Sequence, residues 1–302
     1  MYLTEVKERF KQYRKNACKL LKISCGHVPA ILTNHAQSKC TTNLEQEKEI
    51  FVRRAGYEPN LDNPQTFNEK IVSNKRRLRD PLMVTTSDKY AVRKYVAEKI
   101  GPEVLVPLLA VGDASLKLWK IPRPAIAKPT NASGRIAILR TYYEALAAQY
   151  RMKQWLREPY GEGKNEWSYT QIDPKIVVEK LLIGEDGKLP IDYKYHCFAG
   201  KCKLVELHFD RLTDHTRTIY WPDWTLAPFE WEQRRGPDVP CPVQHTQMIE
   251  YAEILTAPFA YARADFYVVD HRVYFGEITH YPNSGFGRFD PIEWDRKLGE
   301  WL

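Results

Sequence analysis

Two acidic residues near the C-terminal end, Asp265 and Glu277, have the spacing of a metal site on a β-hairpin. They lie in two segments rich in Val, Tyr, Phe and Ile, joined by the polar residues 270–272, which is typical of two strands and a turn. With a three-residue turn the two acids lie opposite each other, on the face that also carries Thr279. Facing like charges destabilise a ladder, whereas Mg²⁺ is commonly held by one or two carboxylates and substrate phosphates. The sequence therefore predicts a magnesium site, although a slip of one residue would separate the acids and leave a solvated hairpin.

A lysine inside an apolar strand, and the loop of small residues after it, indicate phosphate binding. Lys128 ends the apolar segment 125–128, and the loop 129–135 leads into a second apolar segment at 136–139. Two strands joined by such a loop can turn backbone N–H groups toward phosphates. A buried ammonium group needs a partner, and a phosphate would serve. The loop by itself also fits an ordinary hairpin.

Two further strands carry polar residues that could lie beside a nucleotide. In the apolar segment 177–182, exposed backbone beside Lys180 and Leu181 could bond the edge of an adenine. Asp192 and Lys194 begin another strand and share one of its faces. Both patterns also fit edge strands with solvated charges or an exposed ion pair.

Signatures of several other enzyme classes are absent from the sequence. Gly163-Lys164 is followed by Asn165, so this segment is not a P-loop, and neither HExxH nor GxSxG occurs. No Asp-x-Asp occurs either, which argues against a metal-dependent glycosyltransferase of the usual kind.

Length and composition predict a globular cytoplasmic protein. The chain has 302 residues, of which 43% are hydrophobic, enough for two domains or for one with an elaborate periphery. No run approaches the roughly 18 apolar residues of a membrane span, and no signal peptide is evident. The six cysteines form no CxxC pair, so we expect reduced thiols rather than disulfides or a zinc site.

The positive charge is concentrated at the N-terminus. Residues 1–22 hold seven basic and two acidic residues, a net +5 of the +7 of the whole chain. Their apolar residues recur at three- and four-residue spacing, which predicts a helix that either packs on its own domain or lies on an anionic membrane at the inner face. The rest of the chain is nearly balanced, which disfavours nucleic acid as a partner. The oligomeric state cannot be read from the sequence.

The elements that position these residues form an α+β pattern. Residues 66–69 have the capping box Thr66–Glu69 of a helix start, and another helix is expected from about 86–88 to Gly101. Runs of strands with interspersed helices favour mainly antiparallel sheets. We expect further helices at 45–55, 142–157 and 243–257, and strands at 104–111, 124–128, 135–139, 175–182, 190–199 and 203–209.

Taken in order, the motifs resemble the ATP-grasp superfamily, and among its members the TupA-like proteins named for teichuronopeptide synthesis. The resemblance runs over about residues 50–302. It implies a fold in which two α+β subdomains grip ATP. We place the boundaries at 1–85 for an N-terminal helical region, 86–182 for the small subdomain with the phosphate loop, and 183–302 for the subdomain with the metal site. The motifs that carry the resemblance are Asn63–Lys70, Arg79–Leu82, Ser87–Arg93, Asp192–Lys194, Phe209–Arg211, Arg263–Asp265, Phe275–Glu277, Tyr281–Phe286 and Glu293–Gly299.

The resemblance also implies roles for individual residues. Phosphates would contact Lys89 and Lys128, with Lys194 near the terminal phosphate, and Mg²⁺ would bind Asp265 and Glu277. Thr279 stands where the superfamily often has a metal-binding Asn, so a second ion would be held loosely, and Ala132 stands where another glycine is expected in the loop. The nucleotide-binding residues implied are Lys89, Lys128, Asn131, Ser133, Gly134, Glu179, Lys180, Leu181, Leu182 and Asp192.

The function implied by the resemblance is ATP-dependent carboxylate–amine ligation through an acylphosphate. Lysines and Mg²⁺ would stabilise the charge that develops on the phosphoryl group and on ADP. Arg211, Arg217 and Arg263 could bind the carboxylate of an acidic sugar or polymer of the cell envelope. Among them Arg263 is favoured, since it shares a strand face with Asp265. The alternatives are a glycosyltransferase or other sugar-modifying enzyme of surface polysaccharide synthesis, and a non-catalytic scaffold at the membrane.

Overall fold

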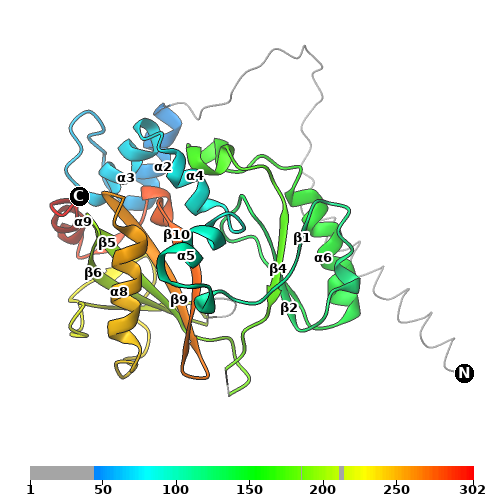
Figure 1. Cartoon of the computed structure of the whole chain (residues 1–302). Helices are drawn as coiled ribbons and strands as arrows, with labels where there is room; N and C mark the ends of the chain where they lie inside the picture. Colours follow the sequence, from blue (N-terminus) through cyan, green and yellow to red (C-terminus); the bar gives the residue numbers. More distant parts are fainter. Residues whose placement is uncertain (1–43, 185, 211–213) are drawn as a thin grey trace, which may run out of the picture. The chain divides into compact units, whose positions relative to one another are not determined.

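A computed structural model describes residues 44–184, 186–210 and 214–302 (Figure 1). The helix predicted at 1–22, with its possible membrane contact, and Arg211 lie outside these described residues.

The described chain starts with four helices and continues with runs of strands interspersed with the remaining helices, as the sequence pattern predicted. The helices are α2 (Leu44–Ala55), α3 (Phe67–Arg77), α4 (Pro81–Ser87), α5 (Val92–Ile100), α6 (Tyr142–Trp155), α7 (Trp167–Thr170), α8 (His245–Thr256) and α9 (Glu293–Gly299). The strands are β1 (Leu108–Gly112), β2 (Ala125–Pro129), β3 (Ala137–Leu139), β4 (Ile176–Lys180), β5 (Asp192–Phe198), β6 (Lys201–Phe209), β7 (Thr216–Tyr220), β8 (Glu230–Trp231), β9 (Tyr261–Val269), β10 (Arg272–Thr279) and β11 (Phe289–Asp290).

Two antiparallel sheets organise these elements. The smaller has the order β1-β4-β2-β3, and the larger has the order β10-β9-β5-β6-β7. A two-stranded ribbon, β11-β8, completes the described sheets. The smaller sheet lies within residues 108–180 and the larger within 192–279, on either side of the expected subdomain boundary at 182/183. The predicted α+β class with antiparallel sheets is confirmed.

The smaller sheet is covered by α6, which lies against it in Figure 1. Ala125 and Ala127 of β2 alternate along the strand toward the helix, and Ala145, Ala148 and Met152 recur along α6 at three- and four-residue spacing. All five are fully buried. The alanines on both elements leave room for the helix to approach the sheet closely.

The two faces of the larger sheet differ in polarity. One face is covered by α8, and its apolar core includes Tyr195 and Phe266. Because side chains alternate along a strand, the polar residues of β5, β6, β7, β9 and β10 gather on the opposite face. Every residue of β5 is buried, so this polar face is enclosed rather than solvated. It carries Asp192, Lys194, His196, Glu206, His208, Arg217, Arg263, Asp265, Glu277 and Thr279.

The described part of the expected N-terminal helical region, residues 44–85, packs against C-terminal parts of the chain. Phe67 at the start of α3 is fully buried, and its ring centroid lies 5.0 Å from that of Tyr261 and 5.6 Å from that of Trp231. On α9, the carboxylate of Asp295 accepts hydrogen bonds from both the backbone and side-chain nitrogens of Asn68. Two motifs at opposite ends of the described chain therefore pack together.

Local signals located most helix ends. Thr66 and Glu69 form the predicted capping box, and Gly56 and Gly101 follow helix ends with φ of 91° and 96°. The helix start expected at 86–88 was wrong. Those residues end α4, while Asp88 accepts from the backbone N–H groups of residues 90 and 91 in the turn before α5.

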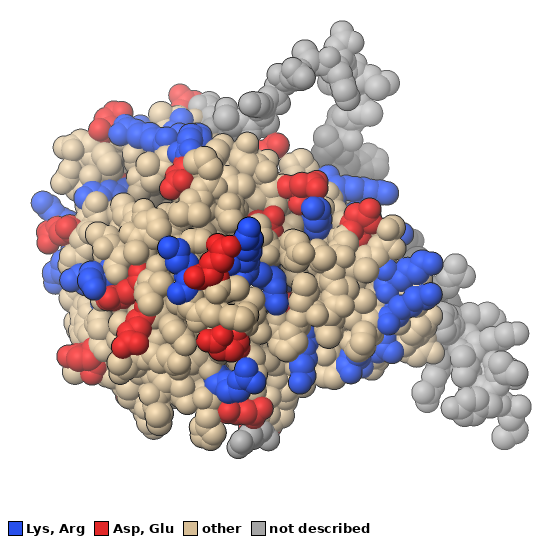
Figure 2. All heavy atoms as spheres, in the orientation of Figure 1, with Lys and Arg blue, Asp and Glu red and all other residues tan. Residues whose placement is uncertain are grey.

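A membrane-spanning helix must be long and apolar, and a single-sign charge patch gathers like charges on one face. None of the helices within the described residues combines the length and the apolar content that crossing a bilayer requires. On the face drawn in Figure 2, basic and acidic side chains are interspersed. Among the described cysteines, Cys197, Cys202 and Cys241 are free thiols.

Candidate active site

The β9–β10 hairpin brings Asp265 and Glu277 together by a route that differs from the predicted one. The turn has two residues rather than three: Arg272 pairs with Val269, and Asp270 and His271 both have positive φ, as a tight hairpin turn requires. A β-bulge next to Gly276 then shifts the register, so that Glu277 still pairs with Asp265. The predicted opposition of the two acids is confirmed, whereas the predicted turn was wrong by one residue.

Asp265 is enclosed by two cations. Arg263 donates to it from Nε and from a terminal nitrogen, at 2.7 and 2.8 Å, and Lys194 forms a short ion pair with the same carboxylate. Burial raises the pKa of Asp265, and the two cations oppose that effect. Lys194 also lies 2.8 Å from Asp192, and because both residues are buried, the alternative of an exposed ion pair does not hold. The sequence favoured Arg263 for binding the carboxylate substrate, but its guanidinium is bound to Asp265 in the structure.

Glu277 is the accessible member of the acidic pair. Its side chain is 28% exposed, against 1% for Asp265. Lys89 Nζ lies 3.4 Å from it, Arg263 lies 3.7 Å away, and the hydroxyl of Thr279 lies 3.4 Å away. The donor set fits a hard cation, since Mg²⁺ needs one or two carboxylates when phosphates supply further oxygens. No group of three or more His, Cys, Asp or Glu side chains converges on a metal position within the described residues.

Lys89 connects the predicted phosphate loop to Glu277. Lys89 Nζ donates to the carbonyl of Ala132 at 2.7 Å, which joins the loop to the acidic pair. Ser133 and Gly134 are exposed, and Gly134 has φ of 75°. Asn131 is buried, and its Oδ1 has no hydrogen-bond partner among the described residues. Ala132 is fully buried, so Ser133 and Gly134 form the exposed tip of the loop.

Lys128 finds its partner within the protein. Its ammonium lies 2.9 Å from Glu179 on the neighbouring strand β4, and Arg93 lies 2.6 Å from the other oxygen of that carboxylate. The side chain of Lys128 remains 16% exposed. A phosphate is therefore not needed to compensate its charge, although an anion could still approach it.

Two backbone N–H groups of the segment expected to contact adenine already donate hydrogen bonds within the protein. The N–H of Lys180 donates to the carbonyl of Pro107 at 2.9 Å, and the N–H of Leu181 donates to that of Pro124 at 3.3 Å. These two amides could bond a nucleotide only if their present hydrogen bonds were broken. Leu182 follows immediately, so an adenine contact would fall to its backbone or to carbonyls of the segment.

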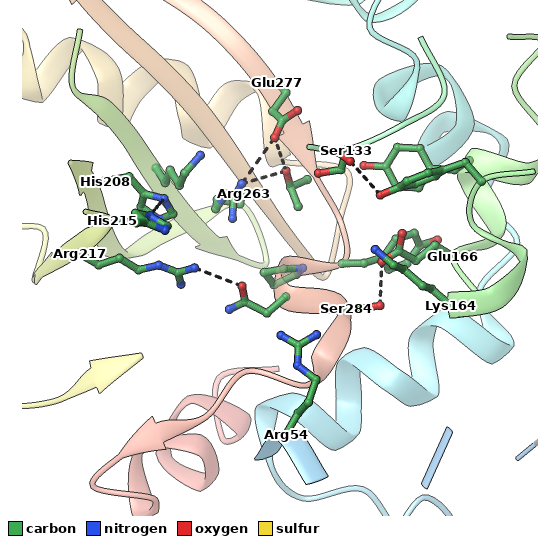
Figure 3. Close-up of a pocket in the computed structure, with 17 residues that line it drawn as sticks. Arg54, Ser133, Lys164, Glu166, His208, His215, Arg217, Arg263, Glu277 and Ser284 are labelled. Carbon is green, nitrogen blue, oxygen red and sulfur yellow. Dashed lines mark hydrogen bonds and ion pairs between the residues drawn. The ribbon is translucent and has the colours of Figure 1, made fainter. Parts of the chain in front are cut away.

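A pocket of about 230 Å³ opens on the polar face of the larger sheet (Figure 3). It brings together the predicted Ser133, Lys194, Arg217, Arg263, Glu277 and Thr279. In Figure 3, Ser133, Lys164 and Glu166 lie on one side, His208, His215 and Arg217 lie on the other, and Arg263 and Glu277 lie between them. The remaining predicted residues that are described do not line it. Residues that the sequence reasoning missed are Arg54, Tyr160, Lys164, Glu166, Tyr169, His208, His215, Tyr281, Pro282, Asn283 and Ser284.

A buried carboxylate, Glu206, organises the histidine side of the pocket. Arg217 donates to it at 2.8 Å, and His196 Nε2 and His208 Nε2 lie 3.2 and 3.1 Å from its oxygens. Burial acts to raise the pKa of Glu206, but Arg217 and the histidines bring it well below its usual value. Burial lowers the pKa of His196 to about 4 and that of His208 to about 3. The alternation of Glu206 and His208 with Val205, Leu207 and Phe209 in β6 could have revealed this polar face.

The opposite side of the pocket is tied to the N-terminal helices. Ser284 donates to the buried Glu166 at 2.8 Å, and burial raises the pKa of that carboxyl. Lys75 of α3 is fully buried, pairs with Glu47 at 3.0 Å, and donates to the carbonyl of Lys164 at 3.0 Å. The packing of α2 and α3 therefore positions this wall.

The sequence profile of the family described as TupA-like ATPgrasp matches residues 69–302. No curated protein matches the chain.

Solved structures with a distant likeness include three enzymes. D-alanine–D-alanine ligase from Bacillus anthracis, complexed with ATP, is 14% identical, with a TM-score of 0.41 over 65% of this chain and 55% of that one. L-amino acid ligase from Bacillus licheniformis is 11% identical, with a TM-score of 0.46 over 72% and 49%. Biotin carboxylase from Campylobacter jejuni is 15% identical, with a TM-score of 0.42 over 72% and 46%. The chain spans about half the length of these structures.

Likenesses this distant add nothing to the assignment, which rests on the family profile. That match covers more than half of the chain and includes the predicted phosphate loop, the acidic pair and every pocket residue except Arg54. It confirms the predicted family and the ATP-grasp fold. The chain belongs to the TupA-like ATP-grasp family.

Proposed function

We propose that the protein is an ATP-dependent carboxylate–amine ligase that forms an amide on an acidic sugar or polymer of the bacterial cell envelope, of the capsule, O-antigen or teichuronopeptide type. Membership of an ATP-grasp family supports ATP as the phosphoryl donor. It also favours an enzyme of this class over a glycosyltransferase or a scaffold. The envelope substrate rests on the TupA-like resemblance.

One observation carries the proposal: an accessible carboxylate, a lysine and an exposed small-residue loop meet at one pocket. Lys89 contacts both the loop, at Ala132, and Glu277, while Glu277 and Ser133 line the pocket itself. Phosphoryl transfer depends mainly on positioning and on compensating negative charge. This arrangement supports placing the terminal phosphates of ATP between the loop and Glu277.

Glu277 and Asp265 are not equally available to Mg²⁺. Glu277 would hold the ion directly, because its carboxylate lines the pocket, with Thr279 beside it. Asp265 would join only if its contacts to Lys194 and Arg263 rearranged. When bound, Mg²⁺ would supply positive charge to the phosphate oxygens.

Arg217 is the residue best placed to bind the carboxylate substrate. It lines the pocket, its NH2 lies 3.5 Å from the amide oxygen of Asn283, and its Nε has no hydrogen-bond partner among the described residues. Arg263 is instead held by Asp265 through two hydrogen bonds. Arg217 would hold the carboxylate for attack on the terminal phosphoryl group, which gives an acylphosphate and ADP. An amine would then displace the phosphate and form the amide.

The test is the dependence of ADP release on two substrates. Purified protein, ATP and Mg²⁺ are incubated with uronic acids (D-glucuronate and D-galacturonate) and amino acids (glycine, L-alanine and L-lysine), separately and together. The proposal expects ADP only when a carboxylate and an amine are both present, with a condensation product in the mass spectrum. A glycosyltransferase would release no ADP from ATP under these conditions, and a scaffold would show no turnover.

Glu277→Gln provides the site control, and Glu98→Gln the matched surface control. Glu277 lines the pocket, whereas Glu98 is 63% exposed on α5 and pairs only loosely with Lys94, at 3.8 Å. The first variant should lower turnover at least about 100-fold, because a group that compensates transition-state charge is lost. The second should behave as the wild type. Near-normal turnover of Glu277→Gln at saturating Mg²⁺ would show that the metal site is misassigned.

We place this activity in the cytoplasm, at the inner face of the membrane where envelope precursors are assembled. The basic segment 1–22 supports that placement through its charge. Co-sedimentation of the full chain and of a chain lacking residues 1–22 with anionic liposomes, at low and high salt, tests it. Equal sedimentation of the two would remove the membrane contact.

A further inference from the structure

The histidine side of the pocket contains a line of three titratable groups that the proposed phosphoryl transfer does not use. His215 Nε2 lies 3.1 Å from His208 Nδ1, and His208 Nε2 lies 3.1 Å from Glu206 Oε1. Both histidines line the pocket beside Arg217, as Figure 3 shows. Glu206 lies behind them and is fully buried. The line therefore runs from the pocket into the sheet.

Glu206 determines which nitrogen of His208 carries the proton. A carboxylate is an acceptor only, and Arg217 already donates to Oε1, the oxygen that faces His208. A lone pair on His208 Nε2 would repel this carboxylate, even though the contact is too bent for a good hydrogen bond. We therefore assign the proton of neutral His208 to Nε2, which makes Nδ1 an acceptor.

The same reasoning extends one step to His215. If His208 Nδ1 accepts, the nitrogen facing it, His215 Nε2, must donate. In neutral His215 the other nitrogen, Nδ1, is then an acceptor. His208 is 6% exposed and burial lowers its pKa to about 3, so it stays neutral and keeps this orientation at physiological pH. His215 is only partly buried and belongs to the pocket wall.

We propose that His215 is the base that takes the proton from the attacking amine, with His208 and Glu206 as positioning residues that hold its tautomer. This proposal rests on the proposed ligase function and adds the second half-reaction to it. Amines with pKa values of about 8 to 10 are largely protonated at neutral pH and cannot attack until they lose a proton. His215 lines the same pocket as Arg217, the residue proposed to hold the carboxylate whose carbonyl is attacked.

The step balances as a simple proton and group transfer. The ammonium gives a proton to His215 Nδ1, and the freed lone pair forms the C–N bond at the carbonyl carbon of the acylphosphate. The C–O bond to phosphate breaks, and the phosphate leaves with its electron pair. The amide nitrogen loses its second proton to phosphate or water, and His215 returns its own proton to solvent.

Other pocket groups suit this role less well. Burial raises the pKa of Tyr160 to about 12, so it keeps its proton at neutral pH. Glu166 accepts a hydrogen bond from Ser284 on the far side of the pocket from Arg217. The charged groups that act on the pKa of His208 are Glu206, Lys194 and Arg217. The ring of His215 contacts that of His208, and Asp192 of β5 pairs with His208 across the ladder.

The first experiment needs no substrate. Nitrogen NMR of protein labelled at histidine reports which ring nitrogen carries the proton, and the His208→Gln and His215→Gln spectra assign the signals. At pH 7.5 we expect both rings to be neutral or, for His215, in exchange with the charged form, with the neutral forms protonated at Nε2. His215 protonated at Nδ1 in its neutral form, or His208 protonated at Nδ1, overturns the proposal.

The second experiment separates the two half-reactions. The uronic acids above are tested with L-lysine and with hydroxylamine, which is largely unprotonated at neutral pH and needs no base. His215→Gln should lower amide formation about 100-fold and flatten its acidic limb in a pH profile, with hydroxamate formation within about twofold of wild type. His271→Gln, a change in the exposed β9–β10 turn, is the matched control and should alter neither.

The outcomes distinguish the two proposals. Equal losses of amide and hydroxamate in His215→Gln overturn the base assignment while leaving the ligase intact. If the wild type releases no ADP with any of these carboxylates, the failure belongs to the proposed substrate class. The NMR result then still decides whether the line from Glu206 to His215 has the protonation that a base requires.

Discussion

Replacing Arg217 with methionine tests the buried network behind the pocket. Arg217 is 8% exposed and donates to Glu206 at 2.8 Å and to the carbonyl of Trp231 at 3.3 Å. Methionine keeps much of the apolar stem but removes the charge and the donors. Glu206, fully buried, would keep only its two histidine contacts.

The expected loss is about 3–5 kcal/mol in the free energy of unfolding, the usual effect of removing one partner of a buried ion pair. That is a large part of the 5–15 kcal/mol that stabilises a typical domain. The loss should be smaller at pH 5.5 than at pH 8. Arg217 helps to keep the pKa of His208 low, so its removal lets a histidine take up a proton and compensate Glu206 as the pH falls.

Urea unfolding followed by tryptophan fluorescence at the two pH values measures both effects. The matched control is Arg235→Met, which removes an exposed arginine paired with Asp238 at 2.8 Å, where side chains are 47% and 63% exposed. That change should stay within about 0.5 kcal/mol of wild type. If Arg217→Met costs no more than the control, or the same amount at both pH values, the buried network does not behave as described.

Three further predictions concern the nucleotide site and the pH response. Lys128→Ala should weaken ATP binding with little loss of stability, because Arg93 continues to compensate Glu179; isothermal titration that gives an unchanged affinity would remove Lys128 from the phosphate site. Lys194→Ala should instead destabilise the fold by about 3–5 kcal/mol, since it removes the buried cation that pairs with both Asp192 and Asp265, and a normal urea midpoint would contradict this. His196, His208 and His280 have pKa values lowered by burial to about 4, 3 and 3. Their unfolded pKa is about 6.5, so the unfolded state binds more protons below that value, and each histidine should cost about 2 kcal/mol of stability between pH 7 and pH 5. Equal stability at pH 5 and pH 7 would refute the assignment.

Local pattern was enough to predict features that depend on strand parity or on neighbouring residues. Glu277 and Thr279 share a face because side chains alternate along a strand, and the capping box at Thr66 needs only residues three apart. Motifs in sequence order were also sufficient for the family. Each of these signals is contained within a few residues or in their order along the chain.

The tertiary structure decided which partner each charged group has. Lys128 pairs with Glu179, 51 residues away, and Arg263 is held by Asp265 instead of remaining available to a substrate. The line from Glu206 to His215 exists because β6 pairs with β7, which starts directly after His215, and because Glu206 is buried behind the pocket. Charge pairing and burial depend on groups far apart in the chain. The sequence therefore determined which side chains share a face within one strand. Only the folded arrangement, with the bulge that brings Glu277 opposite Asp265, determined which strands place their side chains together and which of these side chains line the pocket.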